Sequence, residues 1–356
     1  MGLSSNNNYC VIMAGGIGSR FWPWSQEAMP KQFLDILGNG HSLIQLTYKR
    51  FRKICPAENI LVVSNTKYLN LIKSQIPEIK DENILLEPVR RNTAPCIAYA
   101  SYKIRNISPS ANIIVTPSDH LIENEKAFLE VISKGINSLA QKDQLITIGI
   151  EPTRADTGYG YIQYNKTSSK VDVKEVIQFA EKPDAQVAQD YINRGDFLWN
   201  SGIFIWSAEK ICSELETFLP QVSHPFNSMK KRFGSPEERS MIDSIFPALE
   251  DISIDYGVME KSESVGVIPA SFGWSDLGTW GSLYEHLKLD ENQNATFNSV
   301  PVTSNASGNI IKVSPGKNVV IEGLSDYIIV ETENELLICS KKSEQAIKDF
   351  VAQLKP

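Results

Sequence analysis

The sequence predicts an α/β protein with a doubly wound, mixed, mostly parallel sheet, helices on both faces, and a small all-β domain at the C-terminal end. Three observations predict this fold. Short apolar stretches alternate with amphipathic helical patterns from residue 9 to about 150, a glycine-rich loop follows the first stretch, and the composition becomes β-rich after residue 294. Continuously apolar strands separated by helices are typical of parallel sheets with right-handed crossovers.

The first part of the chain supplies most strands of the predicted sheet. Apolar runs predict strands at Tyr9–Met13, Asn59–Ser64, Asn83–Leu86, Asn112–Thr116 and Gln144–Ile150. Between the last two, apolar residues from 128 to 139 recur at helical spacing and form one buried stripe. Since ligands of such sheets bind at the carboxyl ends of strands, we expect the functional residues there.

From residue 151 the pattern is less regular. Strands are predicted at Tyr161–Tyr164, Val173–Phe179, Gly202–Trp206 and Ser264–Ile268, and helices begin near Ala185, Ala208 and Pro236, with a last helix over Gly278–Leu289. We therefore predict one large domain over residues 9–289.

A polar stretch at residues 290–294 separates a second, small domain at residues 295–356. It contains short β-rich runs at Asn309–Val313, Asn318–Ile321, Tyr327–Val330 and Glu335–Cys339, and a closing helix over about Ser343–Leu354. The runs favour a few turns of β-helix. Because this domain carries apolar runs and no recognisable site motif, we expect a structural or subunit-contact role and a homodimer.

Composition excludes several classes of function. The formal net charge of −7 argues against a nucleic-acid partner, so an anionic substrate must be attracted by local cations such as Arg20, Lys31, Arg90 and Arg91. Five scattered cysteines without a Cys-x-x-Cys pair favour reduced thiols, and the four histidines have no metal-binding spacing. The N-terminal residues lack a signal-peptide pattern and no apolar run is long enough for a membrane span, so we expect a cytoplasmic protein.

The glycine-rich loop is the most informative motif. The run Ala14-Gly-Gly-Ile-Gly-Ser-Arg20 follows a strand, and Pro30-Lys-Gln-Phe33 adds a second cation. Glycines let backbone N–H groups approach an anion, and arginine and lysine suit several phosphates at once. A Walker loop would need Gly-Lys-Ser/Thr, and a dinucleotide loop would need glycine where Phe21 stands. The alternative is a tight strand-to-helix turn, but the downstream cations favour a triphosphate site.

Three carboxylates are candidates for chemistry beside such a loop. Asp119 follows a predicted strand and Asp276 lies in Trp274-Ser-Asp-Leu-Gly278, so the two would hold Mg²⁺ if they converge; the alternative for Asp119 is a helix N-cap. Glu87 also follows a predicted strand, and its carboxylate can accept both guanine N1–H and N2–H₂, for which adenine has no matching donors. Its alternative is an ordinary surface charge before a turn.

Polar residues among glycines and aromatics suggest a sugar site. Glu181 and Asn200 would provide acceptors and donors for hydroxyls, and Lys182 would face a sugar phosphate. Singly, each is more often a turn residue or a surface lysine. Their joint presence favours the site.

These motifs together resemble the nucleotidyltransferase family of nucleoside-diphosphate-sugar pyrophosphorylases, and within it the mannose-1-phosphate guanylyltransferases. The resemblance extends from about residue 9 to beyond 340. It rests on the loop at 14–20, the Pro-Lys-Gln-Phe run at 30–33, Glu87-Pro with Asn92-Thr-Ala-Pro95, Pro117-Ser-Asp-His120, Thr157-Gly-Tyr-Gly-Tyr-Ile162, Glu181-Lys-Pro183, Trp199-Asn-Ser-Gly202, Ser253-Ile-Asp-Tyr256 and Trp274-Ser-Asp-Leu-Gly278.

The resemblance implies a Rossmann-like catalytic domain, a small C-terminal left-handed β-helix, and the following site residues. The triphosphate would be held by Ala14, Gly15, Gly16, Gly18, Ser19, Arg20 and Lys31, the guanosine by Glu87, Arg91, Asn92 and Thr93, Mg²⁺ by Asp119 and Asp276, and the hexose phosphate by Gly160, Glu181, Lys182, Asn200 and Asp255. The implied reaction transfers GMP from GTP to α-D-mannose 1-phosphate and releases pyrophosphate.

Three alternatives remain at this stage. One is a guanylyltransferase for another sugar phosphate, such as a heptose or fucose phosphate. Another is a non-catalytic regulatory homologue that binds a GDP-sugar, against which Arg20, Lys31, Asp119 and Asp276 argue. An NAD-dependent dehydrogenase fits the α/β pattern but lacks the glycine fingerprint.

Overall fold

The structure, a computed structural model, describes residues 7–167, 172–297 and 301–354. It divides into two compact units. The sheet unit comprises Met1–Gly15, Thr47–Ser118 and Ile122–Trp274, and the C-terminal unit comprises Gly16–Leu46, Asp119–Leu121 and Ser275–Pro356. The boundaries of these units differ from those of the predicted domains, because residues 16–46 and 119–121 belong to the same unit as the C-terminal residues. The two domains at 9–289 and 295–356 stay a prediction.

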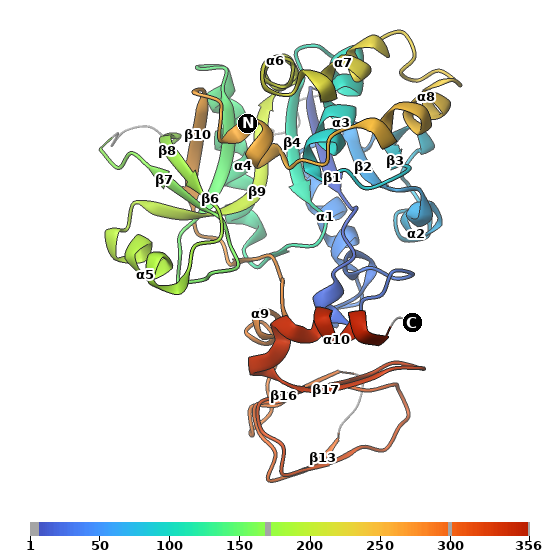
Figure 1. The fold of residues 1–356 in the computed structure, drawn as a ribbon, viewed down its shortest axis with the longest axis vertical. Coiled ribbons are helices and arrows are strands. Elements are labelled where there is room, and N and C mark those ends of the chain that lie inside the picture. The colour runs from blue at the N-terminus through green and yellow to red at the C-terminus, as the bar shows by residue number, and fades with distance from the viewer. Residues whose placement is uncertain (1–6, 168–171, 298–300, 355–356) are drawn as a thin grey trace. The chain divides into compact units, whose positions relative to one another are not determined.

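The sheet unit contains one nine-stranded sheet with the order β3-β2-β1-β4-β9-β6-β10-β8-β7 (Figure 1). Its strands are β1 Asn8–Met13, β2 Ile60–Asn65, β3 Ile84–Glu87, β4 Asn112–Pro117, β6 Leu145–Ile150, β7 Tyr161–Tyr164, β8 Lys174–Ala180, β9 Phe197–Ser207 and β10 Val265–Ala270. The predicted strands are thus confirmed with small shifts at their ends, except that β9 begins well before Gly202.

The sheet contains both parallel and antiparallel strand pairs, so the expectation of a mostly parallel sheet is correct for only part of it. Strands β3, β2, β1 and β4 are parallel neighbours, and so are β6 and β10. The long strand β9 is antiparallel to both β4 and β6. A strand buried on both faces is apolar throughout in either direction, so the pattern of apolar residues could not reveal this reversal.

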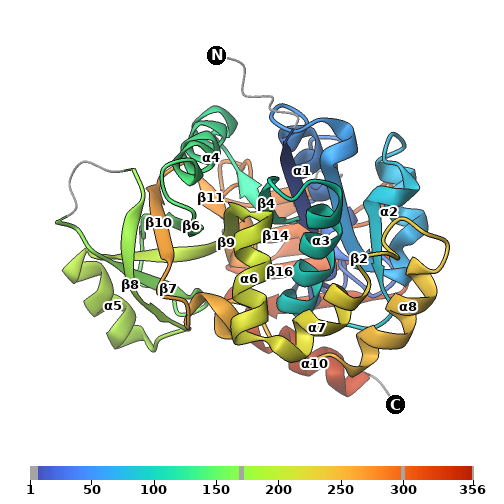
Figure 2. The same cartoon turned by 90° about the horizontal axis from the view of Figure 1, so that it is seen from above.

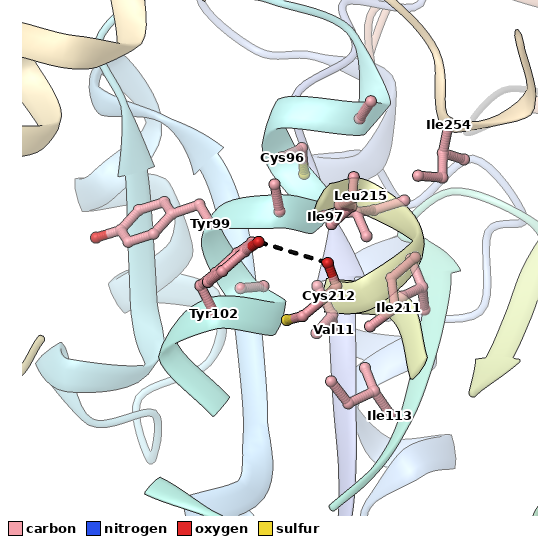
Figure 3. Close-up of a cluster of buried hydrophobic side chains, with 14 of the residues drawn as sticks. Val11, Cys96, Ile97, Tyr99, Tyr102, Ile113, Ile211, Cys212, Leu215 and Ile254 are labelled. Carbon is pink, nitrogen blue, oxygen red and sulfur yellow. Dashed lines mark hydrogen bonds between the residues drawn. The ribbon is translucent and has the colours of Figure 1, made fainter. Parts of the chain in front are cut away.

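Helices cover both faces of this sheet, as predicted. Figure 2 shows α4 on one face and α3, α6 and α7 on the other. The helices of the unit are α2 Leu69–Gln75, α3 Thr93–Ile107, α4 Glu125–Leu139, α5 Ala185–Arg194, α6 Ala208–Phe218, α7 Pro220–Ser228 and α8 Glu238–Ile245, and α1 Leu43–Phe51 crosses from one unit into the other. The strands and helices α3 and α6 share a core in which Val11, Ile97, Ile113 and Leu215 are fully buried (Figure 3).

The C-terminal unit combines loops from the first part of the chain with β-rich rungs from the end. Its elements are the short helices η1 Ser19–Phe21, η2 Lys31–Phe33 and α9 Trp280–Tyr284, the strands β12 Ala295–Phe297, β13 Val302–Ser304, β14 Ile310–Lys312, β15 Val320–Glu322, β16 Tyr327–Glu331 and β17 Leu336–Ser340, and the helices η8 Lys341–Ala346 and α10 Ile347–Leu354. Strands β12, β14 and β16 are parallel, β13 and β15 likewise, and β17 closes the sheet in the antiparallel sense. Two short strands, β5 Leu121–Ile122 and β11 Trp274–Ser275, lie where the chain passes between the units.

Helix α9 is much shorter than the predicted helix over Gly278–Leu289. The side chain of Asp290 accepts hydrogen bonds from the backbone N–H groups of Asn292 and Asn294. Aspartate and asparagine bind nearby backbone in this way in turns and compete with helix formation. The helix already ends at Tyr284. The N–H groups of His286 and Leu287 then donate three residues back, to the carbonyls of Leu283 and Tyr284, in turns that precede this polar loop.

One core joins the distant segments of the C-terminal unit. Phe21 packs against Trp280 with ring centroids 5.0 Å apart, and both are buried with Phe297, Ile310 and Ile328 in one cluster. A chain truncated after Asn294 loses the last three and leaves the two aromatics exposed. We expect insoluble protein or a strong fall in Tm, because burial of each large apolar side chain stabilises by about 1.5–3 kcal/mol.

Solubility and thermal unfolding of the truncated chain check this expectation. Thr296→Ala is the matched control, because Thr296 lies in β12 between Ala295 and Phe297 but its side chain is exposed. A truncated chain as soluble and heat-resistant as the full chain would contradict a shared core.

Candidate active site

The glycine loop is held in shape by glutamine and serine side chains. After β1, Gln32 Nε2 donates to the carbonyl of Gly16 at 3.0 Å, and Ser25 Oγ donates to the carbonyl of Ile17 at 2.6 Å. Gly18 has a positive φ of 69°, and a Cβ there would lie 2.6 Å from Lys31 Cβ. Only glycine fits at this position, because any side chain would push against Lys31.

Lys31 is buried at the wall of a cavity. Its Nζ lies 2.8 Å from Asp119 Oδ2 and donates to the carbonyls of Asp276 at 2.7 Å and Leu277 at 3.0 Å. Three oxygens thus surround the ammonium, whose side chain is 5% exposed. Lys31 therefore contacts protein oxygens in this structure, and its predicted contact with a triphosphate stays a prediction.

The cavity, of about 250 Å³, brings the predicted phosphate and metal residues together. It is lined by residues 18–21, Lys31, Asp119, His120 and residues 276–278. The Asp276 turn is tight, because Asp276 Oδ1 accepts from the N–H of Gly278 at 2.9 Å and Leu277 has a positive φ of 45°. Beside Lys31 the pKa of Asp119 is lowered, although burial acts in the opposite direction. Both carboxylates and exposed Arg20 therefore face one small polar cavity.

Glu87 is a buried carboxylate at the end of β3. It is 4% exposed, and its Oε1 has no hydrogen-bond partner among the described residues. Gly15 adjoins it, since a Cβ built on Gly15 would lie 3.6 Å from Glu87 Oε2. Burial raises the pKa of Glu87 to about 7, and the nearby Cys96 thiol and Arg90 guanidinium counteract this rise only in part. An unsatisfied buried acceptor is costly, so the geometry suits a ligand with N–H donors.

The residues after Glu87 have structural contacts. Asn92 is the N-cap residue of α3, and its side chain accepts from the N–H of Thr93 at 2.9 Å. Thr93 Oγ1 accepts from the N–H of Ile254 at 2.9 Å, and Arg91 donates to the carbonyl of Pro247. The structure thus connects these three residues to α3 and the segment that follows α8. Their predicted contact with guanosine stays a prediction.

The predicted sugar residues converge within the sheet unit. Asn200 lies in β9, its N–H donates to the carbonyl of Gly160 at 2.8 Å, and its Nδ2 donates to Asp255 Oδ1 at 2.8 Å. The amide orientation is fixed because Asn200 Oδ1 accepts from the N–H of Gly202 at 3.2 Å. Asp255 begins a short π-helix, η7 Asp255–Met259, and burial raises its pKa. Such helices frequently occur at functional sites.

Glu181 completes this group. A Cβ built on Gly160 would lie 2.8 Å from Glu181 Oε2, so glycine leaves space for the carboxylate. Lys182 pairs with Glu181 at 3.2 Å between Nζ and Oε1 and is 62% exposed. Carboxylate, amide and ammonium groups therefore lie together. The first two kinds of group suit the hydroxyls of a sugar phosphate, and the ammonium suits its phosphate.

Sequence reasoning missed two contacts of the candidate site. Cys96 was interpreted only as a core thiol, yet it lies close enough to the proposed base reader Glu87 to lower the pKa of that carboxylate. Arg90 was named as a cation, and the structure shows that its Nε donates to the carbonyl of Gly15 at 3.1 Å. Cys96 follows the Asn92 cap by four residues, so one turn of α3 returns it toward the end of β3, a signal that helix periodicity could have given.

The remaining expectations on composition agree with the structure where it bears on them. All five cysteines are unpaired and buried. Among the described residues, none of the helices is both long and apolar enough to cross a membrane. A location in the cytoplasm stays a prediction.

The chain is similar to one protein family and to several named proteins. A family model for nucleotidyl transferases matches residues 9–293. The mannose-1-phosphate guanylyltransferase RfbM of Salmonella typhimurium is 36% identical over 353 residues, which cover 97% of this chain and 72% of that protein. The alginate biosynthesis protein AlgA of Pseudomonas putida is 34% identical over 348 residues, with coverage of 97% and 71%.

A solved structure is similar along nearly the whole chain. It is described as a mannose-1-phosphate geranyltransferase from Thermus thermophilus, is 27% identical and has a TM-score of 0.86, and the match covers 98% of this chain and 100% of that one. Its likeness supports the observed mixed α/β fold with a separate β-rich C-terminal region. The sequence, the fold and these matches agree, and the chain belongs to the nucleotidyl transferase family.

Proposed function

We propose that the protein transfers GMP from GTP to α-D-mannose 1-phosphate and releases pyrophosphate. The observation that carries the proposal is Glu87, a buried carboxylate beside Gly15 whose Oε1 has no hydrogen-bond partner among the residues that the structure describes. Guanine presents N1–H and N2–H₂ to such a group, and a site built for specific hydrogen bonds rejects bases that lack them. Two relatives at 36% and 37% identity are named mannose-1-phosphate guanylyltransferases, which supports the choice of sugar.

In the proposed reaction, a phosphate oxygen of the sugar phosphate attacks the α-phosphorus of GTP in line. A new P–O bond forms at the α-phosphorus. The bond between the α-phosphorus and the oxygen that bridges the α- and β-phosphates breaks, and pyrophosphate leaves with the electron pair of that bond. The attacking phosphate is already ionised at neutral pH, so no general base is required. Positioning and neutralisation of charge must then supply most of the rate enhancement.

The residues present fit a divalent cation. Asp119 and Asp276 line the same cavity, and the described residues contain no group of three or more histidine, cysteine or acidic side chains around one point. Mg²⁺ suits such a site, because it commonly takes one or two carboxylates and completes its shell with water and substrate phosphates. Bound there, Mg²⁺ would neutralise charge on the triphosphate.

Arg20 at the cavity would stabilise charge that moves toward the leaving pyrophosphate. We expect Arg20→Ala to lower kcat by about 10²–10³ and to change KM for GTP much less. Steady-state kinetics with both substrates check this. A variant with unchanged kcat and a raised KM would show that Arg20 only anchors GTP.

We also propose that the parallel rungs β12, β14 and β16 with β13 and β15 are turns of a left-handed β-helix and that the protein is a homodimer. Ala295 pairs with Ile310 and Ile310 with Ile328, which supports regular stacking. Exposed apolar side chains on the same region, among them Val302 and Val320, would suit a subunit contact. Sedimentation equilibrium tests the dimer.

A pyrophosphate-release assay tests the function. GTP, ATP, CTP and UTP are each combined with the 1-phosphates of mannose, glucose, fucose and a heptose. We expect GTP with mannose 1-phosphate to have the highest kcat/KM. A different best sugar would refute the sugar assignment, and binding of GDP-mannose without turnover would indicate a regulatory protein.

A further inference from the structure

Lys31 occupies the position in which a catalytic cation would be expected. Its Nζ lies 2.8 Å from Asp119 Oδ2, and two carbonyls of the Asp276 turn complete its surroundings at 2.7 and 3.0 Å. An ammonium that makes three such contacts is satisfied without substrate. The structure therefore contains a positive charge on the carboxylate that the proposed function assigns to Mg²⁺.

This contact is built into the fold and is not a loose surface pair. The Lys31 side chain is 5% exposed, and the absence of a Cβ at Gly18 leaves room for it. Phe21 lies on its other side, with the ring centroid 5.7 Å from Nζ. The ammonium is thus held at Asp119 by packing as well as by charge.

Two cations cannot share Asp119 on equal terms. Mg²⁺ binds carboxylate oxygens at about 2.0–2.1 Å and fixes their geometry. An ammonium within hydrogen-bond distance of the same group repels the divalent ion, and the burial of Lys31 reduces the screening of this repulsion by solvent. A divalent ion at Asp119 therefore competes with Lys31 for Oδ2, the oxygen that Nζ contacts at 2.8 Å.

We propose that Lys31 is an internal counter-ion for Asp119 and that a divalent cation displaces its ammonium when it binds. The inference rests on the proposed function, because that function makes Asp119 a metal ligand. The displaced ammonium would then be available to substrate phosphates, the role that the sequence predicted. Lys31 would thereby couple metal binding to phosphate binding. Its ammonium would pair with Asp119 before the metal binds and with the substrate phosphates after the metal has displaced it.

Binding of Mn²⁺ to the nucleotide-free protein tests the proposal, with the free ion followed by electron paramagnetic resonance. We expect Lys31→Met to bind Mn²⁺ about tenfold or more tightly than the unaltered protein, because a charge-assisted contact no longer competes. Arg20→Met is the matched control: it removes a cation of the same cavity that is exposed, so the change should stay below about fivefold. Asp119→Asn combined with Lys31→Met should lose the gain.

A measurement on the unaltered protein covers the case in which Lys31→Met does not fold. Acetylation of lysines by an N-hydroxysuccinimide ester is followed by mass spectrometry with and without Mn²⁺. We expect Mn²⁺ to raise the labelling rate of Lys31. The rate at Lys103, which is similarly buried and paired with Glu238 at 2.8 Å, should not change.

The outcomes separate this inference from the proposed function. Equal or weaker Mn²⁺ binding by folded Lys31→Met, or unchanged labelling of Lys31 by saturating Mn²⁺, overturns the counter-ion role. Tighter binding together with no GTP-dependent pyrophosphate release overturns the proposed function and leaves the counter-ion role standing. No Mn²⁺ binding by any folded form overturns both the counter-ion role and the metal site.

Discussion

Asp119→Asn and Asp276→Asn are each expected to lower kcat by about 10³ or more, because each removes a carboxylate from the cavity where the triphosphate would be neutralised. Both side chains line that cavity with Arg20. Asparagine keeps the size of aspartate but removes its charge. Because Asp119→Asn also removes the partner of buried Lys31, the Tm of each variant is measured beside its turnover to separate loss of catalysis from loss of stability. Pyrophosphate release at saturating GTP and mannose 1-phosphate, over a range of Mg²⁺ concentrations, provides the measurement.

The control must also remove an ion-paired carboxylate. Asp196 pairs with Arg194 at 2.9 Å and accepts from Gln163 at 2.8 Å, and it belongs to neither proposed substrate group. Asp196→Asn should therefore keep its kcat. Full turnover in excess chelator, or by both cavity variants, would contradict the metal site.

The sequence was sufficient for the strands and for most of the candidate site. Strand ends such as Met13 and Glu87 were predictable because an apolar run stops abruptly at a glycine or a charge. Asn200, Asp255, Gly160 and Glu181 were predicted to act together, and the structure places them in contact. The motifs contain residue types that act together in one kind of site. Because they lie near the ends of strands, formation of the sheet brings them together.

What the sequence could not predict was the direction of β9 and the partner of Lys31. The direction of a buried strand depends on the connections before and after it, and an apolar run contains no such information. Lys31 was expected at a phosphate, but in the structure its ammonium neutralises Asp119. Charge pairing between residues far apart along the chain depends on the tertiary fold, which motif reading does not supply.

The largest expected effect on specificity comes from Glu87→Gln. The unaltered protein should prefer GTP over ATP by roughly 10⁴ in kcat/KM, since adenine leaves the buried carboxylate unpaired. ITP lacks only the N2 amino group of GTP, and we expect it to be used about 10–100-fold less well, the value of one charge-assisted hydrogen bond. In Glu87→Gln both preferences should fall, because the amide offers a single acceptor. Rates with the three nucleotides check the prediction.

The protonation of Glu87 gives a second, independent test of its proposed role in binding guanine. Burial raises its pKa to about 7, so the carboxylate is largely protonated below that pH and cannot accept two guanine N–H groups. The KM for GTP should therefore fall as pH rises through about 7 and then level off, whereas Glu87→Gln should show no such change. Both proteins share the titration of the sugar phosphate, so the difference between their profiles belongs to Glu87.

Stability should change with pH in the opposite sense to GTP affinity. A raised pKa in the folded state means that the native protein binds more protons than the unfolded chain between about pH 4.5 and 7, so the contribution of Glu87 to stability is lost as pH rises through this range. Glu87→Gln avoids the buried charge and should have a Tm at pH 8 at least equal to that of the unaltered protein. A variant that loses base preference without losing stability would identify Glu87 as a base reader. A variant that instead unfolds at lower temperature and keeps its preference for GTP would show that Glu87 is structural.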